Sequence, residues 1–294
     1  MKKLMIIFFT LLLTFQISAL EDDKNLLIRE EFDSINDLNF HLYDEDVTIN
    51  QLVGDKIIME IYSNNKKKIP DYEIFNKTLT VKSKPGKKSN FDLCKIVIYI
   101  PENYRAGSLI FKSENSDVKI ENFTSDIIDL TLLGGNLEVK NVNAVSMIAK
   151  NKSGTINVWN TKSEEIKLST LNSPVEITNF IGEYVCIESE SGKIDVQNIS
   201  CDYFDFETVK SDIKVELQKS PLASSFIKSV NGNVELYTAK GVGFNLYAFS
   251  NSGRFNDEFD DLKFFVQEGF YKNYFEGTCD ISIETSFGDI TVGN

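Results

Sequence analysis

Apolar and polar residues alternate in short runs along most of the chain, and the runs return at a fixed interval. In each run a Ser or Gly is followed, after one variable residue, by an apolar residue, a polar residue and a second apolar residue. The Ser or Gly positions are Ser116, Gly135, Gly154, Ser173, Gly192 and Ser211, with 19 residues from each to the next (135 minus 116). Alternation with a period of two predicts strands with one buried face. A fixed interval predicts a solenoid, in which each coil lays the same side chains over those of its neighbour.

The apolar residues after each Ser or Gly are mostly β-branched, which suits a pleated, half-buried surface. They are Val118/Ile120, Leu137/Val139, Ile156/Val158, Val175/Ile177, Ile194/Val196 and Ile213/Val215. A second alternating pair, such as Ile166 and Leu168, precedes each Ser or Gly. Each coil therefore carries two short strands joined at a Ser/Gly corner, and a third, shorter side is expected after the second corner.

Polar residues repeat at the corners as well. Six residues past each Ser or Gly stand Asn122, Asn141, Asn160, Asn179 and Asn198. Asparagine tolerates a left-handed backbone and bonds to neighbouring backbone groups, so it fits a bend. Stacked at one position, these amides can also bond to one another along the axis. Hydroxyl residues share another position, three residues before the Ser or Gly: Ser113, Thr170, Ser189, Thr208 and Ser229.

The interval changes near both ends of the chain. Gly232 and Gly253 follow at steps of 21 residues and Gly288 comes 35 residues later, which predicts an insertion rich in Phe, Tyr and Asp at about 254–276 within a solenoid over 106–294. A degenerate early copy surrounds Glu45, and further strand-like runs follow it. We expect residues 20–105 to form an irregular N-terminal β region that caps the solenoid; a separate domain is the alternative.

The first 19 residues have the pattern of a secretory signal. Lys2 and Lys3 precede the apolar run Leu4–Leu13, and cleavage is expected after Ala19. An uncleaved membrane anchor is the alternative, but the apolar run is short for a span. We expect an exported protein that is periplasmic, displayed on the cell surface or secreted. Loss of the two lysines takes the formal charge from −13 to −15, which disfavours a nucleic-acid partner.

Lysines crowd one part of this acidic chain. They include Lys66, Lys67, Lys68, Lys87 and Lys88. We expect these five residues either to contact an anionic envelope polymer or lipid headgroups, or to lie in solvated loops.

The four cysteines are spaced unfavourably for pairing. Cys186 lies six residues before Gly192, whereas Cys201 lies ten before Ser211. This offset of four residues is about 13 Å along a strand, while a disulfide needs Cα atoms within about 7 Å. Free thiols are predicted, unless a sharp corner brings the pair together. Cys94 and Cys279 each lie an even number of residues from apolar residues of the same strand, so their side chains should point to the same, buried side.

Residues for common chemistry are sparse. His41 is the only histidine and is expected to face solvent, and no nucleophile elbow, P-loop or dinucleotide fingerprint occurs. We therefore predict no catalytic residue, no cofactor and no metal site. Outward carboxylates alternate with lysines, as on a solvated surface. The acidic run at 257–261 lacks the glycine-spaced pattern of calcium loops, so a solvated loop is favoured over a calcium site.

Aromatic residues are the stronger functional signal. Trp159, Tyr184, Tyr203, Tyr237, Tyr247 and Phe249 occupy phases that point outward. The insertion adds Phe264, Phe265, Phe270, Tyr271 and Tyr274, which we predict as a ligand-binding surface. A contiguous exposed apolar patch usually binds something. The alternative is that the insertion folds back over these faces or caps the last coil.

Three stretches of the chain carry a family resemblance. They are Phe32 to Ile49, Val97–Pro101 leading into Ser116–Ile120, and Ile283–Ile290. With these motifs the chain resembles the bacterial exported "putative adhesin" solenoids of unknown function, which are related to the auto-transporter adhesin head (GIN) domain. The resemblance implies a single-stranded β-helix and export. It implies no established activity and no site residues.

Together these patterns predict an all-β, single-stranded parallel β-helix with right-handed winding. About nine coils at roughly 4.8 Å each would make a rod roughly 40 Å long. The expected function is an exported, non-enzymatic scaffold that binds a glycan, an envelope polymer or a surface protein. One alternative is a carbohydrate-active enzyme, a polysaccharide lyase or hydrolase. Another is a structural protein that self-associates end to end, because a bare last coil offers unpaired backbone.

Overall fold

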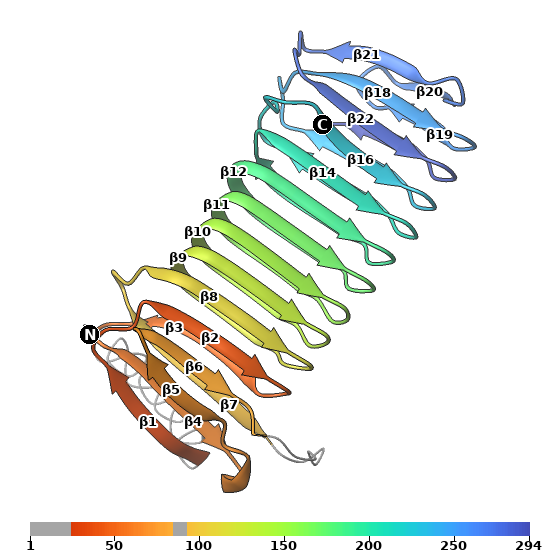
Figure 1. The fold of residues 1–294 in the computed structure, drawn as a ribbon. Helices are drawn as coiled ribbons and strands as arrows, with labels where there is room; N and C mark the ends of the chain where they lie inside the picture. The colour runs from red at the N-terminus through yellow and green to blue at the C-terminus, as the bar shows by residue number, and fades with distance from the viewer. Residues whose placement is uncertain (1–24, 85–92) are drawn as a thin grey trace, which may run out of the picture.

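The structure is a computed structural model that describes residues 25–84 and 93–294. The predicted signal peptide, 1–19, lies outside the described residues. The strands of the described residues form one 23-stranded, largely parallel sheet that winds into a long stack (Figure 1). The all-β solenoid-like architecture predicted from the alternating pattern is confirmed.

Four long strands make the regular middle of the stack. They are β9 (Val118–Leu132), β10 (Leu137–Asn151), β11 (Ile156–Thr170) and β12 (Val175–Ser189). All pair in parallel, and partners lie one sequence repeat apart, as Leu137 with Ile156 and Ile156 with Val175. Each strand runs through the Asn corner without a break, because the residues on both sides of that corner keep their partners in the next coil.

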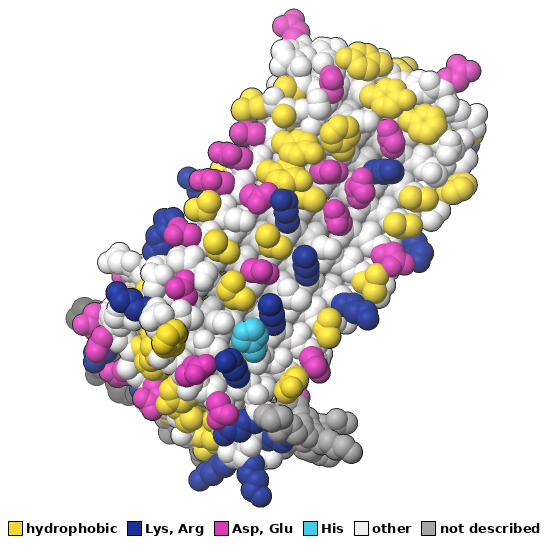
Figure 2. All heavy atoms as spheres, viewed as in Figure 1, with side chains coloured by type: hydrophobic (Ala, Val, Ile, Leu, Met, Phe, Trp, Pro, Cys, Tyr) yellow, Lys and Arg dark blue, Asp and Glu magenta, His cyan; other side chains and the backbone are white. Residues whose placement is uncertain are grey.

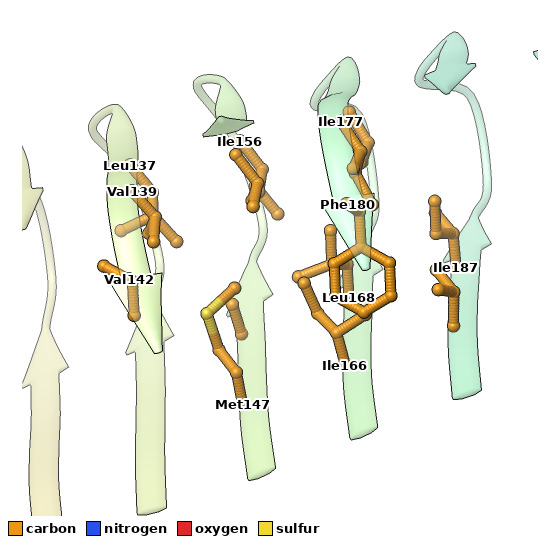
Figure 3. Close-up of a cluster of buried hydrophobic side chains, with 14 of the residues drawn as sticks. Leu137, Val139, Val142, Met147, Ile156, Ile166, Leu168, Ile177, Phe180 and Ile187 are labelled. Atoms are coloured by element: carbon orange, nitrogen blue, oxygen red, sulfur yellow. The ribbon is translucent and has the colours of Figure 1, made fainter. Parts of the chain in front are cut away.

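The apolar pairs point inward and form one continuous core. Val139, Ile156 and Phe180 are each 0% exposed. Figure 3 shows how such side chains from successive strands lie over one another. Since every coil offers the same apolar surface to the next, the core has no boundary between coils, and the inward phases predicted from the sequence are confirmed.

The Asn corners form a hydrogen-bonded ladder. Each corner Asn has a left-handed backbone, with φ between 50° and 57°. The side-chain Nδ2 of Asn141 donates to Oδ1 of Asn122 at 3.0 Å, Asn160 to Asn141 at 3.1 Å, and Asn179 to Asn160 at 2.8 Å. Asn122 continues the ladder to Asn50 at 3.2 Å. Axial bonding between stacked asparagines is therefore observed.

We expect Asn160→Ala to lower the free energy of unfolding by about 2 kcal/mol, since it removes two ladder bonds and forces alanine into a left-handed backbone. Asn160→Gly separates the two causes, because glycine accepts the backbone but lacks the amide. Urea denaturation should place glycine between wild type and alanine. If both variants unfold like wild type, the ladder contributes nothing.

The hydroxyl residues close the Ser/Gly corners. The side-chain oxygens of Thr170, Ser189 and Ser229 each accept the backbone N–H three residues later, at 2.8, 2.7 and 2.8 Å. These N–H groups are buried at the corner, where an unsatisfied donor is costly. Corner geometry thus explains the hydroxyl at these three positions, whereas Ser113 bonds to the Ser116 hydroxyl and Thr208 Oγ1 has no partner among the described residues.

At the N-terminal end the early copy stacks directly on the regular coils. Phe40 pairs with Phe111, and Val47 with Val118. The strands involved are β2 (Asp37–Leu42), β3 (Asp46–Leu52), β6 (Thr78–Lys82), β7 (Cys94–Pro101) and β8 (Ala106–Ser113). β2 lies between β8 and β6, and β3 lies between β9 and β7.

Antiparallel strands cover the N-terminal end of the stack. They are β1 (Leu26–Phe32), β4 (Ile57–Ser63) and β5 (Asp71–Phe75), with a 3₁₀ turn at Lys66–Lys68. β5 pairs with β6, β4 pairs with β7, and β1 pairs with β4.

The C-terminal coils do not stack in chain order. Past β12 the strands are β13 (Ile194–Ser200), β14 (Tyr203–Thr208), β15 (Ile213–Leu217), β16 (Ser225–Ser229) and β17 (Val234–Thr238). After them come β18 (Phe244–Ser250), β19 (Arg254–Asp257), β20 (Leu262–Phe265), β21 (Phe270–Tyr274), β22 (Asp280–Thr285) and β23 (Ile290–Gly293). β22 lies between β16 and β18, as Figure 1 shows.

The last in-phase pair does not form the outermost coil. β23, which carries Ile290 and Val292, pairs with β17 on one side and β19 on the other. The chain first builds β18 and β19 one coil further out, covers them with the antiparallel strands β21 and β20, and then returns into the gap. The long insertion provides the length for this return.

Candidate functional site

One side of the stack is a flat sheet, which we call the front face. It is formed by the strands that precede the Ser/Gly corners: β6, β2, β8, the C-terminal halves of β9 to β12, then β14, β16, β22, β18 and β21. Every strand from β2 to β18 in this order has a neighbour on both sides. The face therefore presents side chains, and no open backbone, to solvent.

Hydrophobic side chains gather over the C-terminal half of the front face, as Figure 2 shows. The aromatic patch, as we name it, consists of Tyr184, Tyr203, Phe226, Tyr247 and Tyr271. They belong to β12, β14, β16, β18 and β21. The prediction that Tyr184, Tyr203 and Tyr247 point outward is confirmed.

The rings of the patch differ in exposure. Phe226 is 45% exposed, Tyr247 40% and Tyr271 63%. Tyr184 and Tyr203 are half-buried and stack on each other, with ring centroids 4.8 Å apart and planes at 12°. They stack because residues at the same phase of adjacent coils pair directly, at roughly the distance between neighbouring strands.

Carboxylates surround these rings. Asp205 pairs with Cys186 on one side and Phe226 on the other. Burial raises the pKa of the Asp205 carboxyl, and the nearby charges of Glu207 and Glu188 raise it further. Among the described residues no donor reaches Asp205 Oδ1, although this atom is buried.

A hollow of about 420 Å³ opens beside the patch. Its lining includes Ser169, Glu188, Glu190, Glu207, Val209 and Lys228. Glu190 is held by Lys210, with Nζ 3.0 Å from its Oε1. The hollow and the patch therefore adjoin, since Glu188 and Glu207 lie two residues from Cys186 and Asp205 on the same strands.

The five aromatic residues predicted within the insertion differ in how far they are buried. Tyr274 is buried and stacks on Phe244 at 4.9 Å. Phe264 and Phe270 are half-buried and contact Phe255, with centroids 5.5 and 4.8 Å away. Phe265 and Tyr271 are exposed, at 61% and 63%. Most of this cluster thus packs over the last coil, and only Tyr271 joins the patch.

The acidic run at 257–261 is not a solvated loop throughout, which corrects the expectation. Asp257 is 0% exposed. It accepts hydrogen bonds from the Tyr274 hydroxyl at 2.8 Å and from Lys272 Nζ at 2.5 Å. Lys272 also bridges to Asp260. The insertion buries this carboxylate and supplies its partners, which no local pattern shows.

The predicted basic contact lies at the other end of the molecule. Lys66, Lys67 and Lys68 form the 3₁₀ turn, capped by the side chain of Asn65. Lys66 and Lys67 are exposed and Lys68 is half-buried. Lys87 and Lys88 lie outside the described residues. Lys66, Lys67 and Lys68 are thus far in the fold from the aromatic patch.

The isolated histidine and the thiols form no reactive constellation with each other. His41 is exposed as predicted, between Lys82 and Lys112 in register. Partial burial, then the charges of Lys112 and Lys82, lower the pKa of His41. The four cysteines are free thiols, and Cys201 is buried. Cys94 and Cys279 are half-buried rather than buried as expected, because Cys94 is the first residue of β7 and Cys279 directly precedes β22.

Two other hollows contrast with the patch. One of about 420 Å³ lies beside half-buried Trp159 and the Asn ladder, after the Ser/Gly corners. Another, of about 700 Å³, follows a row of small residues that includes Ser163. The Ser163 hydroxyl donates to backbone carbonyls at 2.7 and 3.1 Å, so it serves the bend. Within the described ranges, no three His, Cys, Asp or Glu residues converge as metal ligands would.

Phe226 is the patch residue that counting from the regular repeat misses. It follows the change of step from 19 to 21 residues, so counting forward from Asp205 by 19 reaches Ser224. Counting back from Gly232 places Phe226 at the phase of Cys186, which precedes Gly192 by the same six residues. The position of the corner glycine, Gly232, therefore predicts the outward phase of Phe226.

The family model described as Toastrack DUF4097 matches residues 35–293. The chain belongs to this family. The match covers most of the described residues. A comparison with curated proteins finds no match.

Solved structures share the fold. A "putative adhesin" from Parabacteroides distasonis ATCC 8503 is 11% identical, with a TM-score of 0.53, over 90% of this chain and 96% of that one. A "putative adhesin" from Bacteroides fragilis NCTC 9343 has the same identity and coverage and a TM-score of 0.44. A "putative lipid binding protein" from P. distasonis is 12% identical over 90% and 96%, with a TM-score of 0.40. At these identities the likeness concerns the fold alone.

In the part of the Toastrack DUF4097 chain that the structure describes, no helix has the length and apolar character needed to cross a membrane.

Proposed function

We propose that this Toastrack DUF4097 protein is an exported, non-enzymatic, adhesin-like binding protein of the cell envelope, and that its aromatic patch binds carbohydrate. The observation that carries the proposal is the group of outward-facing rings on the front face, of which Phe226, Tyr247 and Tyr271 are exposed and Tyr184 and Tyr203 half-buried. Sugar rings have apolar C–H faces that pack on aromatic rings, while their hydroxyl groups bond to carboxylates such as those beside the patch. Rings of this kind combine a large contact area with little conformational entropy to lose.

The architecture supports a scaffold role. We infer that the regular coil is 19 residues long and right-handed, that residues 1–19 direct export, and that residues 20–105 and 254–276 cap the two ends. Antiparallel strands at both ends support the capping roles. They cover the outermost parallel coils, so that the edge of the stack no longer matches a further parallel coil.

Two alternatives have their own support. The neighbouring carboxylates Asp205, Glu188 and Glu207 favour a carbohydrate-active enzyme, which needs two such groups at one bond. Among the described strands, β1, β5, β20 and β21 each pair with a single neighbour, which favours end-to-end assembly. Product formation across a polysaccharide panel would support the first, and concentration-dependent growth in light scattering the second.

The proposed function is tested by glycan-array binding of wild type and the double variant Tyr203→Ala/Tyr247→Ala. We expect wild type to retain a defined glycan class and the double variant to bind it at least roughly tenfold more weakly, since two stacking surfaces are lost. Phe287→Ala is the matched control, because Phe287 is 67% exposed and lies outside the patch. A double variant that binds like wild type would refute the proposal.

A further inference from the structure

We propose that the carbohydrate bound by the aromatic patch carries free amino groups, and that their ammonium groups lie among Asp205, Glu188 and Glu207. This inference rests on the proposed function and deepens it, because it names the ligand class. The proposed occupant of the front face is a glycan built of amino sugars that are not acetylated.

The first support is the charge around the rings. On the front face the patch is bordered by the carboxylates Glu165, Glu188, Asp205, Glu207, Asp280 and Glu284 and by the lysines Lys167 and Lys228. Lys167 is bound to Glu165, with Nζ 2.5 Å from Oε1. With Glu165 and Lys167 paired, five carboxylates and one lysine, Lys228, remain around the patch. Such a surface attracts cations and repels acidic glycans.

The second support is the state of Asp205. Its Oδ1 is buried and receives no hydrogen bond from the described residues, although Glu207 lies two residues further along the same strand and Glu188 lies opposite Glu207 on the adjacent strand. A buried acceptor without a donor is costly. An ammonium group brings three N–H donors and a positive charge. An acetylated amine brings one donor and no charge, so it satisfies this site less well.

The third support is the hollow beside the patch. Its volume of about 420 Å³ lies in the range of small-ligand sites, and three of its lining residues are glutamates. Lys210 holds Glu190, whereas Glu188 and Glu207 take part in none of the ion pairs within the described ranges, and Lys228 lies in register opposite Glu207 at the same hollow. A sugar unit seated there can place its amino group between these two carboxylates while the next units follow the rings.

The sheet itself favours a glycan over a basic peptide. Peptides commonly bind sheets by adding a strand at an open edge. Here β14, β16, β22 and β18 are paired on both sides, so no backbone partner is available along these four strands, and the one open edge of the patch is that of β21 at its end. Contacts must come from ring faces and carboxylates, which suit the faces and amino groups of sugar units.

The test is titration calorimetry with three probes: a β-1,4-linked glucosamine hexamer, the fully N-acetylated hexamer and hexalysine. We expect wild type to prefer the glucosamine hexamer by roughly tenfold over the acetylated one. High salt should shrink the preference, because screening weakens charge pairing at a partly exposed site.

Two variants locate the effect. Asp205→Asn should remove most of the preference, because it weakens binding of the glucosamine hexamer more than that of the acetylated one. Asp129→Asn is the matched control: Asp129 lies at the same phase on β9, in the N-terminal half of the face, between Ile110 and Ile148. It should bind like wild type.

The outcomes separate this inference from the proposed function. Equal binding of the two glycan hexamers, or no change in Asp205→Asn, overturns the amino-sugar assignment and leaves carbohydrate binding intact. Hexalysine binding as tightly as the glucosamine hexamer, with the same dependence on Asp205, overturns it in favour of a basic peptide. If neither hexamer binds, the amino-sugar assignment fails and the glycan array still tests the proposed function; if the hexamers bind but Tyr203→Ala/Tyr247→Ala weakens neither, the proposed function fails as well.

Discussion

Ile156→Lys prevents the protein from folding. Ile156 is 0% exposed and lies in register between Leu137 and Val175, so the ammonium group would enter an apolar stack that continues on both sides. An unpaired buried charge of this kind costs roughly 4 kcal/mol or more. That is a large part of the roughly 5–15 kcal/mol by which proteins are stable. We expect no cooperative thermal transition by far-UV circular dichroism.

Two companions make this result specific. Val196→Lys should behave in the same way, since Val196 is also 0% exposed. Asn157→Lys is the control, because Asn157 neighbours Ile156 on the same strand but lies half-buried on the outer side. It should melt within a few degrees of wild type. If Ile156→Lys shows the wild-type transition, the assignment of inward and outward phases is wrong.

Gly154→Ala is expected to destabilise the protein by about 3 kcal/mol. Gly154 has a φ of 120°, and a Cβ atom there would lie 1.9 Å from the carbonyl oxygen of Gly135 in the adjacent coil. Both backbone strain and a steric clash follow. At roughly 2–4 °C per kcal/mol for a chain of this size, the melting temperature should fall by roughly 6–12 °C.

Gly241→Ala separates strain from clash. Gly241 also has a positive φ, 83°, but a Cβ atom there would meet nothing within 4 Å. Only the backbone cost of about 1 kcal/mol remains, so its melting temperature should fall far less. Equal melting temperatures for the two alanine variants would show that the close approach of coils at the Ser/Gly corner does not limit stability.

These expectations bear on how the scaffold supports the candidate site. The aromatic patch occupies outward positions of strands whose inward positions form the continuous core, so ring spacing follows from coil spacing. Tyr184 and Tyr203 are stacked because Val185 and Phe204, beside them, are stacked inside. Changes in the core should therefore disturb the patch, while changes in the patch should leave the core folded.

Much of this fold was predictable because each coil has the same surroundings as the next. Alternation places Ile156 inward and Tyr203 outward, and the repeated asparagines predict the bends at which the hydrogen-bonded ladder forms. The spacing around Glu45 predicts a degenerate copy of the repeat, and the strands of this copy stack on the regular coils. In a solenoid the neighbours of a residue lie one repeat away, so local periodicity carries tertiary information.

The order of the coils near the C-terminus was not predictable in this way. The position of a residue within the repeat predicts whether its side chain points inward. It does not predict which coil lies beside it, because the coils have similar stacking surfaces. The return of β22 and β23 into the stack depends on the path of the insertion, as does the burial of Asp257 by Tyr274 and Lys272. The neighbours of Asp205 on the front face also required the observed register.

By itself the sequence determined the all-β repeat, the direction of the side chains and the bends, because these follow from alternation and from residues suited to corners. Only the tertiary structure decided which coil lies beside which, which insertion aromatics are covered, and which rings and carboxylates share the front face. The physical reason is that stacking surfaces of β-branched residues are nearly interchangeable, so the choice among them is made by chain connectivity and end packing.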